Sequence, residues 1–133
     1  MNAQQQIRIF KSRWFEKFAR REGITDATLI AVIVQANSGL VDADLGGGLI
    51  KLRVARHGEG KSGSFRTIIF FRRDERAVFA YGFAKSDREG LDANDLRVFK
   101  QAARIVLALT PAQLDAEVRA QRLFEVGSDA QGL

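Results

Sequence analysis

The sequence predicts a single α+β domain in which an antiparallel sheet packs against helices from both ends of the chain. Apolar residues follow helical spacing near the N-terminus and in the C-terminal third, and they alternate with a period of two between residues 49 and 84. No linker rich in Pro, Gly or Ser divides the 133 residues. A chain of this length buries about two thirds of its surface, enough for one core. We therefore expect one domain over residues 1–125 and a frayed tail over residues 126–133.

The N-terminal region predicts a strand followed by an αα-hairpin. Ile7 and Ile9 alternate with polar neighbours in residues 6–10, which is typical of a strand. Ser12 is the expected N-cap of a first helix that stops at Gly23, and Thr25 caps a second helix that ends at residues 37–39. The first helix carries an apolar stripe that we expect to lie in the core: Trp14, Phe15, Phe18 and Ala19.

From residue 49 the pattern predicts a meander of three antiparallel strands. In the first strand one side is apolar, and the other side carries Lys51 and Arg53. A second strand covers residues 65–71, and residues 74–75 form the turn to a third strand over residues 77–84. Alternation places Phe79, Tyr81 and Phe83 on one side of the third strand, where we expect Tyr81 to be packed against its neighbours.

The C-terminal third predicts two helices. Asp92 caps the first, whose apolar face includes Leu96, Phe99 and Ala103. Thr110 and Gln113 form a capping-box pair around a proline at the first helical position, so a second helix begins there.

The positive charge of the chain is concentrated in one stretch. The formal net charge is +5, with a sequence pI of about 10.1. Residues 51–73 hold seven basic residues and one acidic residue, whereas the other 110 residues hold 14 basic and 15 acidic residues. Solvated protein faces usually mix the two signs. Lysine supplies a mobile point charge and arginine a planar fork, so this strand–loop–strand unit suits phosphate.

Composition excludes several kinds of chemistry. With no Cys and one His, the chain has no disulfide, thiolate metal site, cysteine nucleophile or His-rich metal site. No apolar run is long enough to span a membrane, and residues 1–15 lack an apolar signal core. We expect a cytoplasmic protein that contacts no membrane and uses no metal or other cofactor.

The loop over residues 56–64 contains two partial nucleotide-binding motifs. Gly58, Gly60 and Gly63 fit the spacing of the dinucleotide fingerprint, and residues 60–62 resemble the end of a P-loop. A P-loop needs glycine where Ala55 stands, and both motifs need a helix directly after the glycines. Because the sequence predicts a strand there, we reject nucleotide binding.

His57 is the one side chain whose ordinary pKa lies near neutrality. It could act as an acid or base, or be a loop residue that contacts phosphate. The sequence leaves both roles open.

Three segments together resemble the RelE-type toxins of bacterial toxin–antitoxin systems, and among these the HigB-like branch. They are the run Asp42-Ala-Asp-Leu-Gly-Gly-Gly-Leu-Ile-Lys-Leu-Arg-Val-Ala-Arg56, the run Gly58-x-Gly-Lys-Ser-Gly-x-x-Arg66, and Gly82-Phe-Ala-Lys85. The resemblance extends over about residues 9–109. It implies a RelE-like fold, in which an antiparallel sheet has helices on one side and a basic concave surface on the other.

The resemblance also implies an activity and two partners. RelE-type toxins are ribosome-dependent messenger-RNA endonucleases that inhibit translation, need no metal, and are each neutralised by an antitoxin encoded beside them. They cut RNA by drawing the ribose 2′-hydroxyl onto the adjacent phosphate. The implied partners are therefore a cognate antitoxin and messenger RNA on the ribosome.

Carried over by motif, the resemblance implies functional roles for six basic residues: Lys51, Arg53, Arg56, Lys61, Arg66 and Lys85. As a hypothesis, Lys51 or Arg53 assists the attacking hydroxyl, Arg66 holds the phosphorane-like state, and Lys85 or Lys61 helps the leaving group. Arg56, His57 and Lys61 are assigned to phosphate binding. The chain has Ser64 where the family commonly has a second glycine, and no tyrosine follows Lys85 as in the RelE branch, so the residue that stacks on the substrate base stays open.

Two other functions compete with RNA cleavage. The wider superfamily includes ParE-like toxins that poison DNA gyrase on the same fold, and fold alone does not fix function. The same cations would also suit a non-catalytic module that binds nucleic acid or the ribosome.

Overall fold

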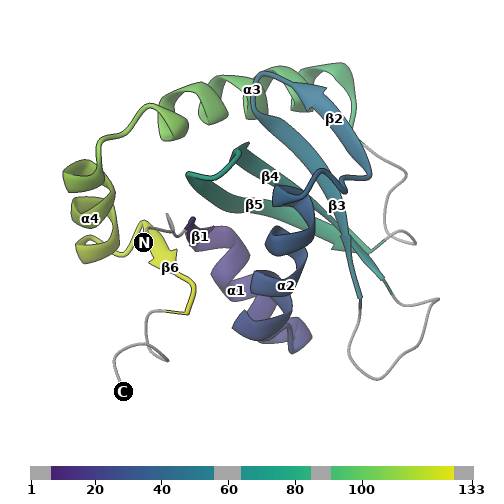
Figure 1. Ribbon diagram of the computed structural model, residues 1–133, viewed down its shortest axis with the longest axis horizontal. Helices are drawn as coiled ribbons and strands as arrows, with labels where there is room; N and C mark the ends of the chain where they lie inside the picture. Colours follow the sequence, from purple (N-terminus) through teal and green to yellow (C-terminus); the bar gives the residue numbers. More distant parts are fainter. Residues whose placement is uncertain (1–6, 56–63, 85–90, 128–133) are drawn as a thin grey trace.

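The computed structural model describes residues 7–55, 64–84 and 91–127. In these ranges the chain forms four helices and one six-stranded mixed sheet with the strand order β2-β3-β4-β5-β1-β6 (Figure 1). The predicted α+β class is confirmed. The elements are β1 (Arg8–Ser12), α1 (Arg13–Glu22), α2 (Asp26–Asn37), β2 (Ala43–Gly46), β3 (Leu49–Val54), β4 (Phe65–Arg72), β5 (Arg76–Ala84), α3 (Ala93–Leu107), α4 (Pro111–Arg119) and β6 (Leu123–Glu125).

The helix starts follow from local hydrogen bonding, and the structure confirms all four predicted N-caps. The side chains of Ser12, Thr25, Asp92 and Thr110 each accept a hydrogen bond from a backbone N–H in the first turn. Gly23 ends α1 in the left-handed conformation, with φ of 72°.

The antiparallel meander has four strands rather than three, because β2 precedes the predicted strands. β2 is short and has no run of alternating apolar residues, so sequence periodicity misses it. Gly47 and Gly48, with φ of 65° and 85°, form the tight turn that joins it to β3.

The sheet is mixed because both ends of the chain add strands beyond β5. β1 pairs with β5 in parallel, with Arg8 opposite Arg76, and β6 pairs with β1 in the antiparallel direction. The expectation of a wholly antiparallel sheet is therefore wrong at β1. A parallel pairing is set by how distant segments come together, and the alternation within β1 carries no information on it.

A β-bulge in β5 corrects the predicted side-chain alternation. Ile68 pairs with Tyr81 and Ile69 with Phe79, so Ala80 is an extra residue on β5. Phe79 therefore packs beneath α1 and α2, while Tyr81 packs on the opposite face beneath α3. The prediction that these two rings share one side is wrong for this reason.

Each face of the sheet has its own core. Helices α1 and α2 cover one face, where Phe15, Phe18 and Leu29 pack on the strands. The apolar residues of α3 and α4 cover the other, through Ala103 and Leu107 of α3 and Leu114 of α4. Figure 1 shows α3 running along the upper edge of the molecule, away from α1 and α2.

Trp14 lies outside the core, contrary to prediction. Its side chain is 43% exposed, whereas Phe15 and Phe18 are buried. The Trp14 ring stacks on Phe18 with centroids 5.1 Å apart and contacts Tyr81 at 4.5 Å. Because α1 begins directly before it, Trp14 lies at the flank of the helix and closes the edge of β5.

Helix α3 is attached to the sheet through its C-terminal end. The buried Arg76 side chain donates hydrogen bonds from Nη1 to the carbonyl oxygens of Val106 and Leu107, both at 3.0 Å. Gly48 lies against the same turn, and a Cβ built there would be 2.6 Å from Leu107 Cδ1. A cation at a helix C-terminus is also favoured by the helix dipole. These contacts fix where α3 crosses the sheet.

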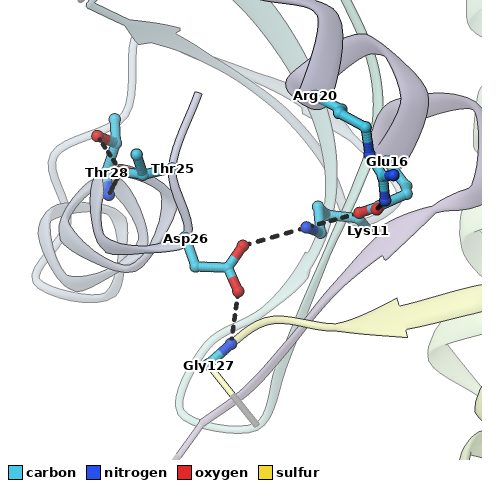
Figure 2. A network of polar contacts seen from close by, with 7 residues as sticks. All are labelled: Lys11, Glu16, Arg20, Thr25, Asp26, Thr28 and Gly127. Atoms are coloured by element: carbon cyan, nitrogen blue, oxygen red, sulfur yellow. Dashed lines mark hydrogen bonds and ion pairs between the residues drawn. The ribbon is translucent and has the colours of Figure 1, made fainter. Parts of the chain in front are cut away.

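A polar network ties the C-terminal segment to the first elements of the fold (Figure 2). Lys11 Nζ contacts Glu16 at 2.7 Å and Asp26 at 3.1 Å, and Asp26 accepts a hydrogen bond from the Gly127 N–H at 3.0 Å. Val126 is buried, and its N–H donates to the Ile9 carbonyl. The packed chain therefore reaches Gly127, beyond the boundary predicted at residue 125.

This network predicts a stability loss in acid. The hydrogen bond from Lys11 holds the pKa of Glu16 below its usual range. A carboxylate with a lowered pKa in the folded state contributes stability above its unfolded pKa and loses that contribution as the pH falls. The free energy of unfolding, measured by urea denaturation, should therefore fall less between about pH 6 and about pH 3 in Glu16→Gln than in the wild type.

Near neutral pH, Glu16→Gln should itself cost about 1 kcal/mol of unfolding free energy. In a Lys11→Met background the same substitution should change the pH profile much less, because the main partner of Glu16 is gone. Identical pH profiles for the wild type and Glu16→Gln would show that the network does not couple folding to protonation.

Candidate functional site

The predicted cationic side of β3 lies on the α3 face of the sheet. Ile50 and Leu52 pack beneath α1 and α2, which confirms the predicted alternation. Lys51 pairs across the sheet with Ile68, which lies in the core beneath α3, and Arg53 pairs with Arg66. Strand parity therefore places Lys51, Arg53 and Arg66 on one face, and we call these three residues the cationic face.

The three residues of the cationic face begin close together on the backbone. Neighbouring strands lie about 5 Å apart, and residues two positions apart on a strand are separated by roughly 7 Å. Arg53 and Arg66 are direct cross-strand partners, an arrangement in which like charges destabilise a sheet. In the described ranges, no carboxylate oxygen lies within 4 Å of their side-chain nitrogens or of Lys51 Nζ, so nothing there neutralises the charge.

The surroundings hold the three side chains to different degrees. Arg53 is exposed, whereas Lys51 and Arg66 are half-buried. Arg66 Nη1 donates a hydrogen bond to Ser64 Oγ at 3.2 Å, which limits the freedom of the guanidinium. Asp42 Oδ2 accepts the Arg53 backbone N–H at 2.6 Å and so fixes the β3 edge next to the site.

The position of α3 leaves the cationic face uncovered. Leu107, near the attachment of α3, packs in one core with Leu49, Phe70 and Val78, which occupy a single row across the sheet. The contact between Phe99 and Tyr81, with ring centroids 5.7 Å apart, lies nearer the middle of the strands. Arg53 and Arg66 lie one further row along, near the opposite ends of β3 and β4.

Aromatic side chains border the cationic face. Phe83 is the cross-strand partner of Arg66, and Tyr81 is the partner of Ile68. Tyr81 contacts the rings of Trp14, Phe83 and Phe99, which confirms the prediction that it is packed. The exposed ring next to it belongs to Trp14, which sequence analysis placed in the core. A helical-wheel angle one residue away from Phe15 was the available signal that Trp14 lies at the flank.

Four predicted site residues lie outside the described residues: Arg56, His57, Lys61 and Lys85. The described strands end at their borders, with Val54 paired to Phe65 and Phe65 paired to Ala84. The roles assigned to these four residues stay predictions. The strand that follows the glycine-rich loop is confirmed as β4, so the helix that nucleotide-binding motifs need does not follow.

Two searches of the described ranges complete the account of the site. No three side chains of the His, Cys, Asp or Glu type come together there as a candidate metal site. None of the described helices has the length and apolar character needed to cross a membrane.

Comparison with known families agrees with the fold and with the cationic face. A family model described as the RelE toxin of the RelE / RelB toxin-antitoxin system matches residues 7–126. A search of curated proteins found no match. The match covers most of the chain, and the protein belongs to the RelE toxin family.

Family membership gives the chain the role of a toxin, with a cognate antitoxin as its partner. The RelE-like fold inferred from the sequence motifs is thereby confirmed. The family match does not distinguish the HigB-like branch, which stays a prediction.

The opposed arginines predict that the site is less stable than it could be. Arg53→Thr should raise the free energy of unfolding by about 0.5 kcal/mol, because it removes the like-charge pair and places a β-branched residue in a strand. Urea denaturation of Arg53→Thr, Arg66→Thr and the double variant gives the coupling between the two positions. We expect a repulsive coupling that shrinks as salt is added.

A coupling near zero at low salt would contradict the proposed strain between the two guanidinium groups. Arg119→Thr, on the exposed end of α4, is the control for losing one positive charge elsewhere.

Proposed function

We propose that this toxin is a metal-independent, ribosome-dependent messenger-RNA endonuclease that inhibits translation. The observation that carries the proposal is the cationic face, where Arg53 and Arg66 lie opposite each other beside Lys51 without a described carboxylate partner. A sheet retains such a repulsive arrangement at a cost in stability, and a phosphodiester would relieve it. The motif resemblance to RelE-type nucleases supports the same substrate.

The proposed reaction is an internal phosphoryl transfer within the RNA. The ribose 2′-oxygen forms a bond to the adjacent phosphorus, and the bond from phosphorus to the 5′-oxygen of the next nucleotide breaks. The 2′-hydroxyl loses its proton, and the leaving 5′-oxygen gains one. The products are a 2′,3′-cyclic phosphate and a 5′-hydroxyl, so no water and no external oxidant or reductant is consumed.

The residues of the cationic face match the charges that develop in this reaction. Lys51 or Arg53 assists the attacking hydroxyl, and the Arg66 fork holds the non-bridging oxygens of the phosphorane-like state. The hydrogen bond to Ser64 supports a preorganised Arg66, which matters because charge stabilisation depends on fixed donors. Lys85 or Lys61 helps the leaving group, and Arg56, His57 and Lys61 bind neighbouring phosphates.

The exposed edge of Trp14 offers a surface on which a substrate base can stack. It lies beside Tyr81, which is the cross-strand neighbour of Ile68 in the row next to Arg66. Stacking on aromatic rings is a general way of holding single-stranded RNA. On the HigB-like resemblance we further place the reaction in the cytoplasm, on messages that ribosomes are translating.

The experiment that tests this function is a map of messenger-RNA 5′ ends after induction of the protein in cells. We expect new ends inside translated codons, and none in a matched message whose start codon is removed. The new ends should carry a 5′-hydroxyl, as the internal transfer requires.

Two other outcomes would identify the competing functions. DNA damage without new RNA ends would indicate a gyrase poison of the ParE type. Growth arrest or RNA binding with neither kind of damage would indicate a non-catalytic module, whose affinity should fall steeply with salt.

A further inference from the structure

The flank of α3 that faces away from Tyr81 carries a second group of cations. Arg97, Lys100 and Arg104 follow one another at helical spacing on one side of α3. Phe99 contacts Tyr81 on the site side, whereas Lys100 lies against the turn between β2 and β3, where a Cβ built on Gly47 would be 3.7 Å from Lys100 Cγ. The two cationic surfaces are therefore separated by the body of α3.

A groove runs along this flank. One hollow of about 600 Å³ lies between the Gly47–Gly48 turn, the end of β4 and the C-terminal half of α3. A second hollow of about 460 Å³ follows the N-terminal half of α3 from Ala93. Both are lined by Lys100 and Arg104, so they join into one groove beside a 15-residue helix, which is about 22 Å long.

The groove has a cationic rim and an apolar floor. The rim consists of Arg72, Arg97, Lys100 and Arg104, and the floor includes Phe71, Leu96 and Leu107. No acidic residue lines either hollow. Of the rim residues, Arg72 has a described carboxylate partner, Glu75 at 3.5 Å, while Lys100 and Arg104 have no ion pair or side-chain hydrogen bond in the described ranges.

The apolar residues next to the groove favour a protein occupant over RNA. Val98 and Ile105, on the outward side of α3, are 53% and 65% exposed, and exposed apolar residues in a group mark protein interaction surfaces. The exposed aromatic ring suited to base stacking, Trp14, lies near Tyr81 on the other flank. Carboxylates for the rim and apolar side chains for the floor are the two features of an acidic amphipathic peptide.

We propose that this groove is the docking site for an acidic, amphipathic segment of the cognate antitoxin. The proposal rests on the toxin role of the chain and not on its nuclease activity. Carboxylates of the segment pair with Lys100 and Arg104, and its apolar side chains cover Leu107, Phe71 and the outward Val98 and Ile105. Because α3 separates the groove from Arg53 and Arg66, docking there anchors the antitoxin without using the residues that bind RNA.

The test is the affinity of the full-length chain for the protein encoded beside it, measured by calorimetry. We expect the double variant Lys100→Glu and Arg104→Glu to bind roughly 100-fold or more weakly, because both rim charges are reversed. The control is Lys17→Glu with Arg119→Glu, which changes the net charge equally at exposed positions on α1 and α4 and should bind like the wild type. Circular dichroism and thermal unfolding check that both variants are folded.

Three results would overturn the proposal. Equal loss of affinity in the groove and control variants would reduce the effect to net charge. Unchanged antitoxin affinity together with lost growth arrest in the groove variant would assign the groove to RNA or the ribosome. A wild-type chain that does not bind the neighbouring protein at all would remove the occupant, whether or not the toxin cleaves RNA.

Discussion

The bond between Arg76 and the end of α3 decides which part of the sheet is open. A buried guanidinium that donates to the last carbonyls of a helix satisfies groups that would otherwise be costly to bury, and it fixes the helix to the start of β5. The absence of a side chain at Gly48 lets Leu107 pack closely at the same end. With α3 held there, the far ends of β3 and β4 receive no helix, and Arg53 and Arg66 lie uncovered.

The same helix separates two kinds of cationic surface. On the side of Tyr81, the strands hold Lys51, Arg53 and Arg66 in fixed register, which suits a phosphodiester whose charge changes during reaction. On the opposite flank, the cations rim an apolar groove, which suits a peptide. Net charge alone would not reveal this division, because the chain total of +5 describes both surfaces together.

Local features of the fold were predictable, and non-local ones were not. The caps at Ser12, Thr25, Asp92 and Thr110 depend on residues a few positions away, and all four were found from the sequence. The parallel pairing of β1 and the short strands β2 and β6 depend on distant segments, and alternation within a strand cannot indicate them. The bulge at Ala80 changes the side on which Tyr81 lies, although the sequence around it continues to alternate.

The site shows the same limit. Strand parity places Lys51 and Arg53 on one side, but their opposition to Ile68 and Arg66 requires the register between β3 and β4. Trp14 reaches the site only through the path of α1 past the edge of β5, and the groove along α3 requires the crossing angle that Arg76 fixes. Residues 51–73 contain the charge that the sequence located, whereas Arg97, Lys100 and Arg104 gain their meaning from tertiary structure.

The central claim is that Arg66 stabilises the charge that develops on RNA phosphate. The most direct measurement is the single-turnover rate at which purified protein cleaves a message bound to the ribosome. Arg66→Ala, with native circular dichroism, should lower that rate by about 100-fold or more, and Arg119→Ala should leave it unchanged. Full cleavage by folded Arg66→Ala would contradict the claim that the cationic face carries out the chemistry.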